Sequence, residues 1–150
     1  MSVDVTTDVV IDRTPSVVAD YAMDPSNAPS WYKNIELVEW VTAPPPRVGS
    51  RVAFVARFLG RRLEYTYELA ELVPAERLVM RTQQGPFPME TAYTFATATA
   101  GSTHMTLRNR GEPAGFSKLV APFMARAMRR ANRKDLAALK EILERSPSAT

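Results

Sequence analysis

The sequence predicts an α+β fold, with a curved seven-stranded antiparallel β-sheet wrapped around a long C-terminal α-helix and two short helices between strands 1 and 2. Three observations lead to this prediction. Apolar and polar residues alternate along seven short segments, which is the period of a strand with one buried face. The connections between the last six segments are short, so neighbouring strands pair antiparallel. The last fifth of the chain has the period of a helix instead.

The first half of the chain supplies one strand and two short helices. The first predicted strand, 3–11, alternates valine and isoleucine with aspartate and threonine. Thr14 can cap a helix and Pro15 suits its first position, so a short helix is expected to continue to Met23. A second cap or turn begins at Asp24 and leads into the second short helix. The remaining strands are expected at 35–42, 52–58, 63–69, 78–82, 89–95 and 105–109.

The second strand has an ambiguous inner face. Ile35, Leu37 and Val41 lie on one side of an ideal strand, whereas Val38 and Trp40 lie on the other. Both sides are apolar, so alternation alone does not decide which side is buried.

The long helix is expected within 111–145. Its apolar residues recur at spacings of mostly three, four and seven, which places them on one broad face. Pro122 lies early in this stretch, and proline is tolerated only in the first turn of a helix. A start at Pro122, with 116–121 as a separate turn or short helix, is therefore left open. The expected buried face comprises Phe116, Val120, Phe123, Met124, Ala127, Ala131, Ala138 and Ile142, and the opposite face carries Arg126, Arg129, Arg130, Arg133 and Lys140.

The outer face of the predicted sheet carries charges of both signs on neighbouring strands. If the hairpins pair as expected, Arg81 lies close to Glu90, and Glu90 lies close to Arg110. Exposed ion pairs of this kind contribute roughly 0–1 kcal/mol each. The single histidine, His104, falls on the same outer side, so a surface position is expected for it rather than a catalytic one.

The inner face of the predicted sheet is rich in tyrosine, phenylalanine and methionine. A solid core would more naturally use leucine, isoleucine and valine, which have well-defined rotamers. Aromatic and methionine side chains around scattered polar tips instead favour an apolar cavity with a few orienting hydrogen-bond groups. A filled core whose tyrosine hydroxyls reach its rim is the alternative.

Composition excludes several classes of function. The 150 residues are expected to form a single domain, 1–150, and the absence of cysteine excludes disulfides, thiolate metal sites and a cysteine nucleophile. No metal-ligand spacing and no phosphate-binding loop occur, so no metal and no cofactor are expected. No membrane span and no signal peptide are recognised, and a cytoplasmic location is expected. The basic helix face lacks interleaved aromatic residues, so no nucleic-acid partner is expected.

Several short motifs occur along nearly the whole chain, and their order is more informative than any one of them. They are IDRTP at 11–15, VVADYA at 17–22, DPSN at 24–27 before Trp31-Tyr32, VGSRV at 48–52, GPFPMET at 85–91 followed by YTF at 93–95, and RNRGEP at 108–113 with Gly115-Phe116.

With these motifs in this order, the chain resembles the START-like, helix-grip superfamily, and in particular the polyketide cyclase/dehydrase group known as SRPBCC proteins. The resemblance implies a seven-stranded antiparallel sheet that grips the C-terminal helix, with a deep apolar cavity between them. Members of the superfamily bind lipids, sterols, polyketides, quinones and other hydrophobic molecules. Some are aromatases or cyclases, and others are co-chaperones or subunits of ring hydroxylases.

The candidate ligand-binding residues face this expected cavity, and no residue is assigned as catalytic or as a metal ligand. Trp31 is either a core plug of the second short helix or a residue at the cavity mouth. Glu90 would reach the mouth only if a β-bulge reversed its side. The candidates are Trp31, Phe54, Phe58, Tyr65, Tyr67, Met80, Met89, Tyr93, Met105, Asn109, Phe116, Phe123 and Met124.

Three functions are compatible with these residues. The first is a carrier or sensor that binds a hydrophobic small molecule such as a lipid, a polyketide or an aromatic compound. The second is an enzyme similar to polyketide aromatases and cyclases, in which tyrosine hydroxyls and Asn109 polarise carbonyl groups. The third is a protein-interaction module that uses the basic helix face. A homodimer is left open.

Overall fold

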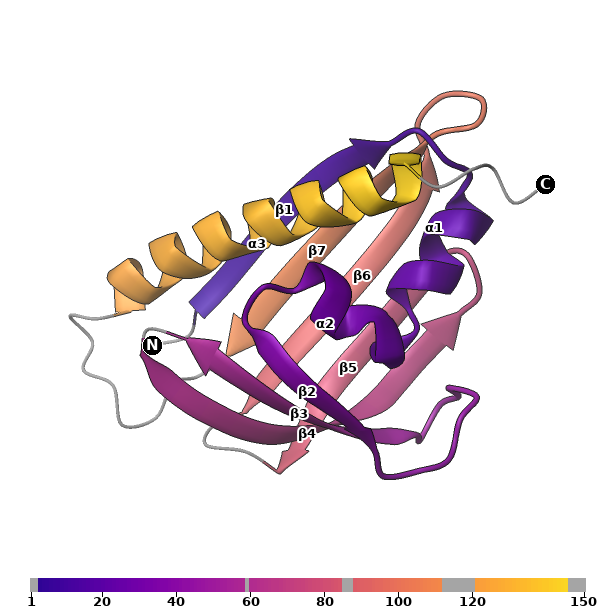
Figure 1. Ribbon diagram of the computed structural model, residues 1–150. Helices are drawn as coiled ribbons and strands as arrows, with labels where there is room; N and C mark the ends of the chain where they lie inside the picture. Colours follow the sequence, from indigo (N-terminus) through magenta and orange to yellow (C-terminus); the bar gives the residue numbers. More distant parts are fainter. Residues whose placement is uncertain (1–2, 59, 85–87, 112–120, 146–150) are drawn as a thin grey trace.

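The computed structural model describes residues 3–58, 60–84, 88–111 and 121–145. The chain begins with β1 (Val3–Ile11), α1 (Pro15–Ala22), the short 3₁₀ helix η1 (Pro25–Asn27) and α2 (Ala28–Trp31). The other strands are β2 (Ile35–Trp40), β3 (Arg51–Phe58), β4 (Arg61–Val73), β5 (Arg77–Gln84), β6 (Met89–Thr97) and β7 (Thr103–Gly111). The chain then forms α3 (Ala121–Arg145), as Figure 1 shows.

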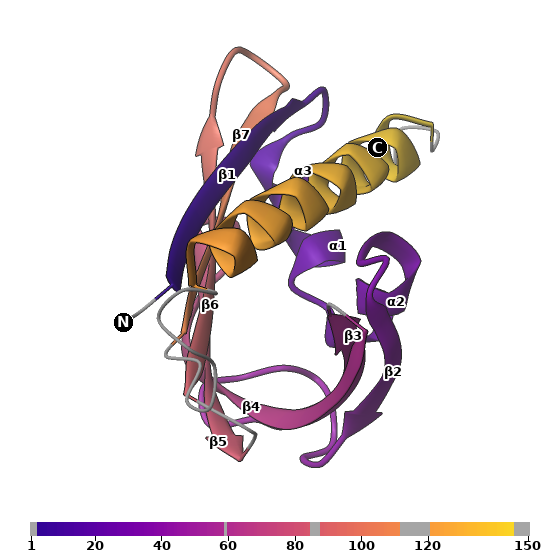
Figure 2. The same ribbon diagram turned by 90° about the vertical axis from the view of Figure 1, so that its left-hand side faces the viewer.

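The seven strands form one antiparallel sheet in the order β1-β7-β6-β5-β4-β3-β2. Successive strands from β2 to β7 pair as hairpins, and β1 pairs with β7 to complete the sheet. Figure 2 shows that the sheet curves from β1 round to β2 and that α3 lies across its concave side. The predicted fold class is therefore confirmed.

Local sequence accounts for the element boundaries. Burial alternates along β1, as the pattern predicted, so one face of the strand is buried and the other is exposed. The Asp24 side chain accepts a hydrogen bond of 3.0 Å from the Ser26 N–H and so caps η1. Thr14 occupies the N-cap position before Pro15, but its hydroxyl caps nothing and lies 3.4 Å from the Ser16 hydroxyl.

A register shift resolves the ambiguous face of β2. Pairing with β3 is irregular between Ile35 and Leu37, and such a bulge reverses the side on which the following residues lie. Val38 and Trp40 therefore pack against the core together with Ile35, whereas Leu37 is 55% exposed.

The α3 helix buries a different face from the one that apolar spacing predicted. Phe123 is 62% exposed, whereas the neighbouring Met124 is buried. The buried face also contains two polar residues, Asn132 and Asp135. A prediction that considers only apolar residues omits these two, so the predicted face is rotated by about one residue from the buried face. The described part of the helix begins at Ala121, and the alternative with a separate turn or short helix over 116–121 falls almost entirely outside the described residues.

Apolar packing beneath α3 is divided into two clusters. The larger cluster packs the side chains of α1 and α2 against the sheet and the C-terminal half of α3, and it includes Trp31, Leu69, Leu107 and Leu139. A small cluster joins Met124, near the start of α3, to Val3 and Val5 on β1. The sheet and helix remain apart between these clusters, and this separation positions the site described next.

Candidate functional site

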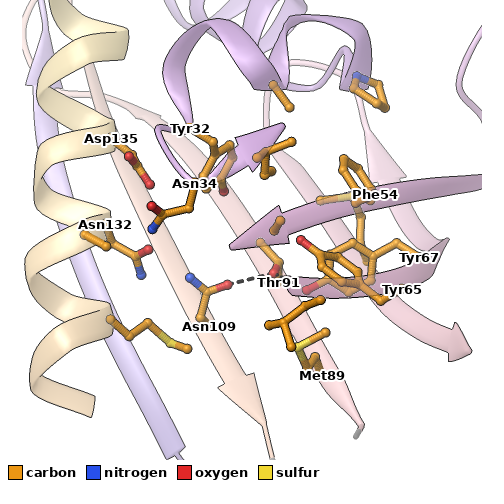
Figure 3. Close-up of a pocket in the computed structure, with 18 of the residues that line it drawn as sticks. Tyr32, Asn34, Phe54, Tyr65, Tyr67, Met89, Thr91, Asn109, Asn132 and Asp135 are labelled. Carbon is orange, nitrogen blue, oxygen red and sulfur yellow. Dashed lines mark hydrogen bonds between the residues drawn. The ribbon is translucent and has the colours of Figure 1, made fainter. Parts of the chain in front are cut away.

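A cavity of about 140 Å³ lies between the concave face of the sheet and the first half of α3. Polar side chains lie on opposite walls, as Figure 3 shows: Asn132 and Asp135 on α3, and Thr91 and Asn109 on the sheet. Asn34 and Arg57 also line the cavity. Most of the wall is apolar. The apolar and aromatic lining comprises Ala22, Met23, Pro25, Ala28, Tyr32, Ile35, Phe54, Ala56, Leu63, Tyr65, Tyr67, Leu78, Met80, Met89, Tyr93, Met124, Met128 and Ala131.

Three aromatic rings from β3 and β4 form one wall of the cavity. Phe54 lies opposite Tyr65 in the strand pairing, and their ring centroids are 5.6 Å apart in a stacked arrangement. Tyr67, two residues further along the same face of β4, meets both rings edge-on at 5.7 and 5.1 Å. Such rings offer a rigid apolar surface to a flat molecule. Burial raises the pKa of Tyr67 to about 12, so its hydroxyl stays neutral at physiological pH.

A chain of hydrogen bonds crosses the sheet at the cavity wall. The Thr91 hydroxyl donates to Asn109 Oδ1 at 2.7 Å, and the Tyr67 hydroxyl lies 2.7 Å from Thr91 Oγ1. A threonine hydroxyl has one proton, so Tyr67 is the donor to Thr91. This arrangement fixes the amide of Asn109, whose Nδ2 has no hydrogen-bond partner among the described residues. A ligand in the cavity would meet that nitrogen as a donor.

A second pair of hydroxyl groups lies nearer to α2. Tyr32 and Tyr93 share a hydrogen bond of 2.6 Å between their hydroxyl oxygens. Burial, the charge interaction between the two rings and their shared hydrogen bond raise the pKa of Tyr32 well above its usual value. Burial likewise raises the pKa of Tyr93. Both rings therefore act as neutral hydrogen-bonding groups.

The α3 helix contributes a buried carboxyl group and a buried amide. Asp135 is only 3% exposed, and its Oδ1 accepts a hydrogen bond of 3.1 Å from the backbone N–H of Lys33. Burial raises its pKa to about 6, although the Lys33 N–H and the Lys33 charge oppose this effect. Asn132, which is 4% exposed, has a buried Nδ2 with no hydrogen-bond partner among the residues that the structure describes. A buried donor without a partner is costly, so this nitrogen is available to an acceptor atom.

Most of the predicted ligand-binding residues line this cavity. Trp31 and Met105 do not, because both are buried in the larger core cluster, where Trp31 packs against Tyr32 and Tyr93. Phe123 points out of the cavity, as its exposure shows. Phe116 and the side chain of Phe58 lie outside the described residues. The predicted residues that do line the cavity are Phe54, Tyr65, Tyr67, Met80, Met89, Tyr93, Asn109 and Met124; their role in ligand binding stays a prediction.

Six polar lining residues were missed by reasoning from the sequence: Tyr32, Asn34, Arg57, Thr91, Asn132 and Asp135. On α3 a usable signal existed, because Asn132 and Asp135 interrupt the apolar row formed by Met128 and Leu136. Polar residues in a row that is otherwise buried point to a polar function at that position.

The charged residues of the outer face take the positions that the sequence predicted. Glu90 accepts a hydrogen bond of 2.7 Å from Arg81 and forms a second ion pair with Arg110. It therefore faces away from the cavity. His104 lies at the surface and its Nε2 is 2.7 Å from Asp8 Oδ2.

Two other features are absent from the described residues. No helix in that part of the chain is both long enough and apolar enough to cross a membrane. The same residues contain no group of three histidine, aspartate or glutamate side chains arranged to hold a metal ion.

A curved antiparallel sheet that grips a C-terminal helix over an apolar cavity is the helix-grip fold. Within that class, the family model described as "Polyketide cyclase / dehydrase and lipid transport" matches residues 2–144. The chain belongs to this family. A search of the curated proteins found no match.

Solved structures support the same fold. A protein from Thermus thermophilus is 21% identical with a TM-score of 0.83, covering 97% of this chain and 99% of that chain. The Zhui aromatase/cyclase from a Streptomyces species is 18% identical with a TM-score of 0.81, covering 99% and 98%. A START superfamily protein from Mycobacterium smegmatis is 14% identical with a TM-score of 0.80, covering 94% and 97%. At these identities the likeness extends to the fold alone.

Proposed function

We propose that this protein binds a hydrophobic small molecule that carries a carbonyl or similar acceptor oxygen, in the cavity between the sheet and α3. The observation that carries the proposal is the buried Asn132 amide, whose unpartnered Nδ2 belongs to a residue that lines an otherwise apolar cavity. The Nδ2 of Asn109, which has no partner in the described part of the chain, supplies a second donor from the opposite wall. The family description, which joins polyketide chemistry with lipid transport, supports this class of ligand.

The size of the cavity limits what it holds. A cavity of about 150 Å³ in another protein accepts one benzene molecule, and the cavity here measures about 140 Å³. One ring or a short chain therefore fits between the sheet and α3 without rearrangement. A larger ligand would have to extend beyond this volume.

The proposal is tested with acetophenone and ethylbenzene, which have similar shapes but differ in a carbonyl oxygen. Isothermal titration calorimetry should give roughly tenfold tighter binding of acetophenone, because it satisfies a buried donor that ethylbenzene leaves unpaired. In Asn132→Leu the preference should fall, while ethylbenzene binding persists.

A cavity-filling variant provides the control. Ala56 lines the cavity, whereas Ala53, three residues earlier on the same strand, lies on the opposite side of β3. Ala56→Leu should abolish binding of both compounds, and Ala53→Leu should leave it intact. Equal binding to wild type and Ala56→Leu would contradict the proposed location.

A second function, a cyclase-like enzyme, is favoured by one specific observation. Asp135 combines burial, a position on the cavity wall and a pKa raised to about 6, and these properties suit a general base that works near neutral pH. A carboxylate there would remove a proton from carbon between two carbonyl groups. The Asn132 and Asn109 amides would stabilise the resulting enolate oxygen.

The enzymatic alternative predicts a pH profile. With a short poly-β-ketone as substrate, the rate should rise with pH through about 6 as Asp135 ionises. Asp135→Asn should lower the rate by roughly 100-fold or more while binding is retained, since general base catalysis contributes about 10²–10⁴-fold. Unchanged turnover in Tyr67→Phe and Asn109→Ala would restrict the chemistry to Asp135 and Asn132. Unchanged turnover in Asp135→Asn would rule out this mechanism.

A further inference from the structure

A second hollow adjoins the cavity and opens between α3 and the link from α2 to β2. Its volume is about 360 Å³. Asn34, Ala131 and Asp135 line both the hollow and the cavity, so the two spaces meet at these residues. Figure 3 shows Asn34 and Asp135 close together at this boundary. We call this second hollow the basic mouth, after the residues described next.

Four cationic side chains line the basic mouth: Lys33, Arg126, Arg130 and Lys134. Three of them follow one another at a spacing of four residues on α3, so they form one row along the helix. Like charges at this spacing repel each other and destabilise an isolated helix. None of the four forms an ion pair with a carboxylate among the described residues.

The rest of α3 shows the opposite pattern. Lys140 pairs with Glu144 at 2.6 Å, and Arg145 pairs with Glu141, both at a spacing of four residues. Among the described residues that line the basic mouth, Asp135 alone is acidic, so the lining carries a formal charge of +4 − 1 = +3 when Asp135 is ionised. An unbalanced positive charge at the entrance of an apolar cavity attracts anions.

Apolar side chains lie beside these cations. Phe123, which is 62% exposed, lines the basic mouth together with Ala127 and Ala131. The two alanines are four residues apart, and their small side chains leave space along the helix surface. The mouth therefore offers both apolar surface and positive charge, a combination that suits a molecule with an apolar body and a negative group.

We propose that the basic mouth binds the anionic group, a carboxylate or a phosphate, of an amphiphilic ligand whose apolar part occupies the adjoining cavity. This inference rests on the proposed function, because it assumes that the cavity binds a hydrophobic molecule. Arg126 and Arg130 can each offer two parallel N–H donors to a carboxylate or phosphate. Lys33 and Lys134 add charge on either side. A ligand that spans both spaces is also larger than the cavity alone accepts.

Three probes with the same chain test the inference: dodecanol, dodecanoate and dodecyl phosphate, each used below its micellar concentration. Isothermal titration calorimetry with the full chain should give at least roughly tenfold tighter binding of one or both anions than of dodecanol. This preference should shrink as salt is raised, because exposed charges are screened. The ratio between the two anions distinguishes a carboxylate ligand from a phosphate ligand.

Matched charge reversals locate the effect. Arg126→Glu/Arg130→Glu should remove the preference for anions and leave dodecanol binding unchanged. Arg129→Glu/Arg133→Glu makes the same change of charge on the same helix, at residues that do not line the basic mouth, and should keep most of the preference. Circular dichroism spectra of both variants should match the spectrum of wild type.

Each other outcome overturns the inference. Equal affinity for dodecanol and both anions would overturn it and leave the proposed function standing. An equal loss in the two double variants would show that only net charge matters, which also overturns a defined site. If none of the three probes binds, the inference fails, and the acetophenone experiment then decides separately whether the cavity binds a ligand.

Discussion

The outer and inner faces of the sheet differ in how their polar groups are satisfied. On the outer face, Arg108 makes two hydrogen bonds to Asp4, and Glu90 pairs with both Arg81 and Arg110. Water reaches these groups as well. The concave side is buried. Among the described residues there, the Asn132 amide nitrogen has no hydrogen-bond partner, and no cationic side chain lies within ion-pair distance of the Asp135 carboxyl group.

This difference shows that the cost in folding stability lies on the concave face of the sheet. An exposed ion pair adds little to stability, and its loss is correspondingly small. A buried polar group without its full set of partners lowers stability, and such positions concentrate where a protein binds or reacts. The buried polar groups of the concave face therefore lower the stability of the protein, whereas the ion pairs of the outer face do not. Three substitutions test this contrast.

The largest effect is expected for Asp135→Asn. The folded state raises the pKa of Asp135 from 3.8 to about 6, so the folded protein binds its proton more tightly than the unfolded chain does. Stability from this group is therefore present below pH 3.8 and is lost as pH rises through 6. Asparagine keeps an acceptor for the Lys33 N–H but carries no charge. At pH 8, Asp135→Asn should raise the free energy of unfolding by about 1–3 kcal/mol.

Urea unfolding at pH 8 and at pH 4 checks this prediction. The gain should be present at pH 8 and should largely disappear at pH 4, where wild-type Asp135 is protonated. Asp20→Asn, at an exposed position of α1, is the control and should change little. A variant that is less stable than wild type at pH 8 would contradict the account.

A moderate effect is expected for Tyr67→Phe. This change removes the hydroxyl that donates to Thr91 and leaves a hydrogen-bond acceptor unsatisfied, so it should cost about 1 kcal/mol. Tyr65→Phe is a matched control, because the Tyr65 hydroxyl has no hydrogen-bond partner among the described residues. Thermal unfolding should lower the Tm of the first variant clearly more than that of the second. Equal shifts would show that the Tyr67–Thr91–Asn109 chain contributes nothing measurable.

The smallest effect is expected on the outer face, for Glu90→Gln. Partial burial alone would raise the pKa of Glu90, but hydrogen bonds from Arg110 and Arg81 outweigh it and lower that pKa below 4.5. The stabilisation is thus present above pH 4.5 and is lost as the pH falls. At pH 7 the substitution should cost at most about 1 kcal/mol, and less in high salt. Chemical denaturation at two salt concentrations measures this, with Glu64→Gln as a more exposed reference.

The fold could be predicted from the sequence because it depends on patterns that are local and repeated. Alternation placed the strands, and short turns fixed their antiparallel order, including the predicted approach of Arg81 to Glu90. The aromatic wall of Phe54, Tyr65 and Tyr67 follows from the same alternation. Element type and strand order each rest on many residues that agree, so single exceptions such as Leu37 do not disturb them.

The polar part of the site was less predictable, for a physical reason. Asp135 and Asn132 become cavity residues only because α3 is rotated so that they lie inward, and a search for apolar faces omits both polar residues. The Tyr32–Tyr93 hydroxyl pair joins residues 61 positions apart, which no local pattern specifies. The exposure of Phe123 likewise depends on the rotation of the helix and not on its own hydrophobicity.

The pairing of β1 with β7 has a consequence for how the chain folds. Val3 lies opposite Gly111, and Ile11 lies opposite Thr103. The first strand therefore pairs with residues about a hundred positions later in the chain. During synthesis β1 leaves the ribosome before β7 and can pair with it only after β7 has followed. Pairing over such a distance slows folding, and an unpaired apolar strand is prone to aggregation in the interval. Asp4 and Asp8 give β1 a charged face, which opposes aggregation of the strand before it pairs with β7.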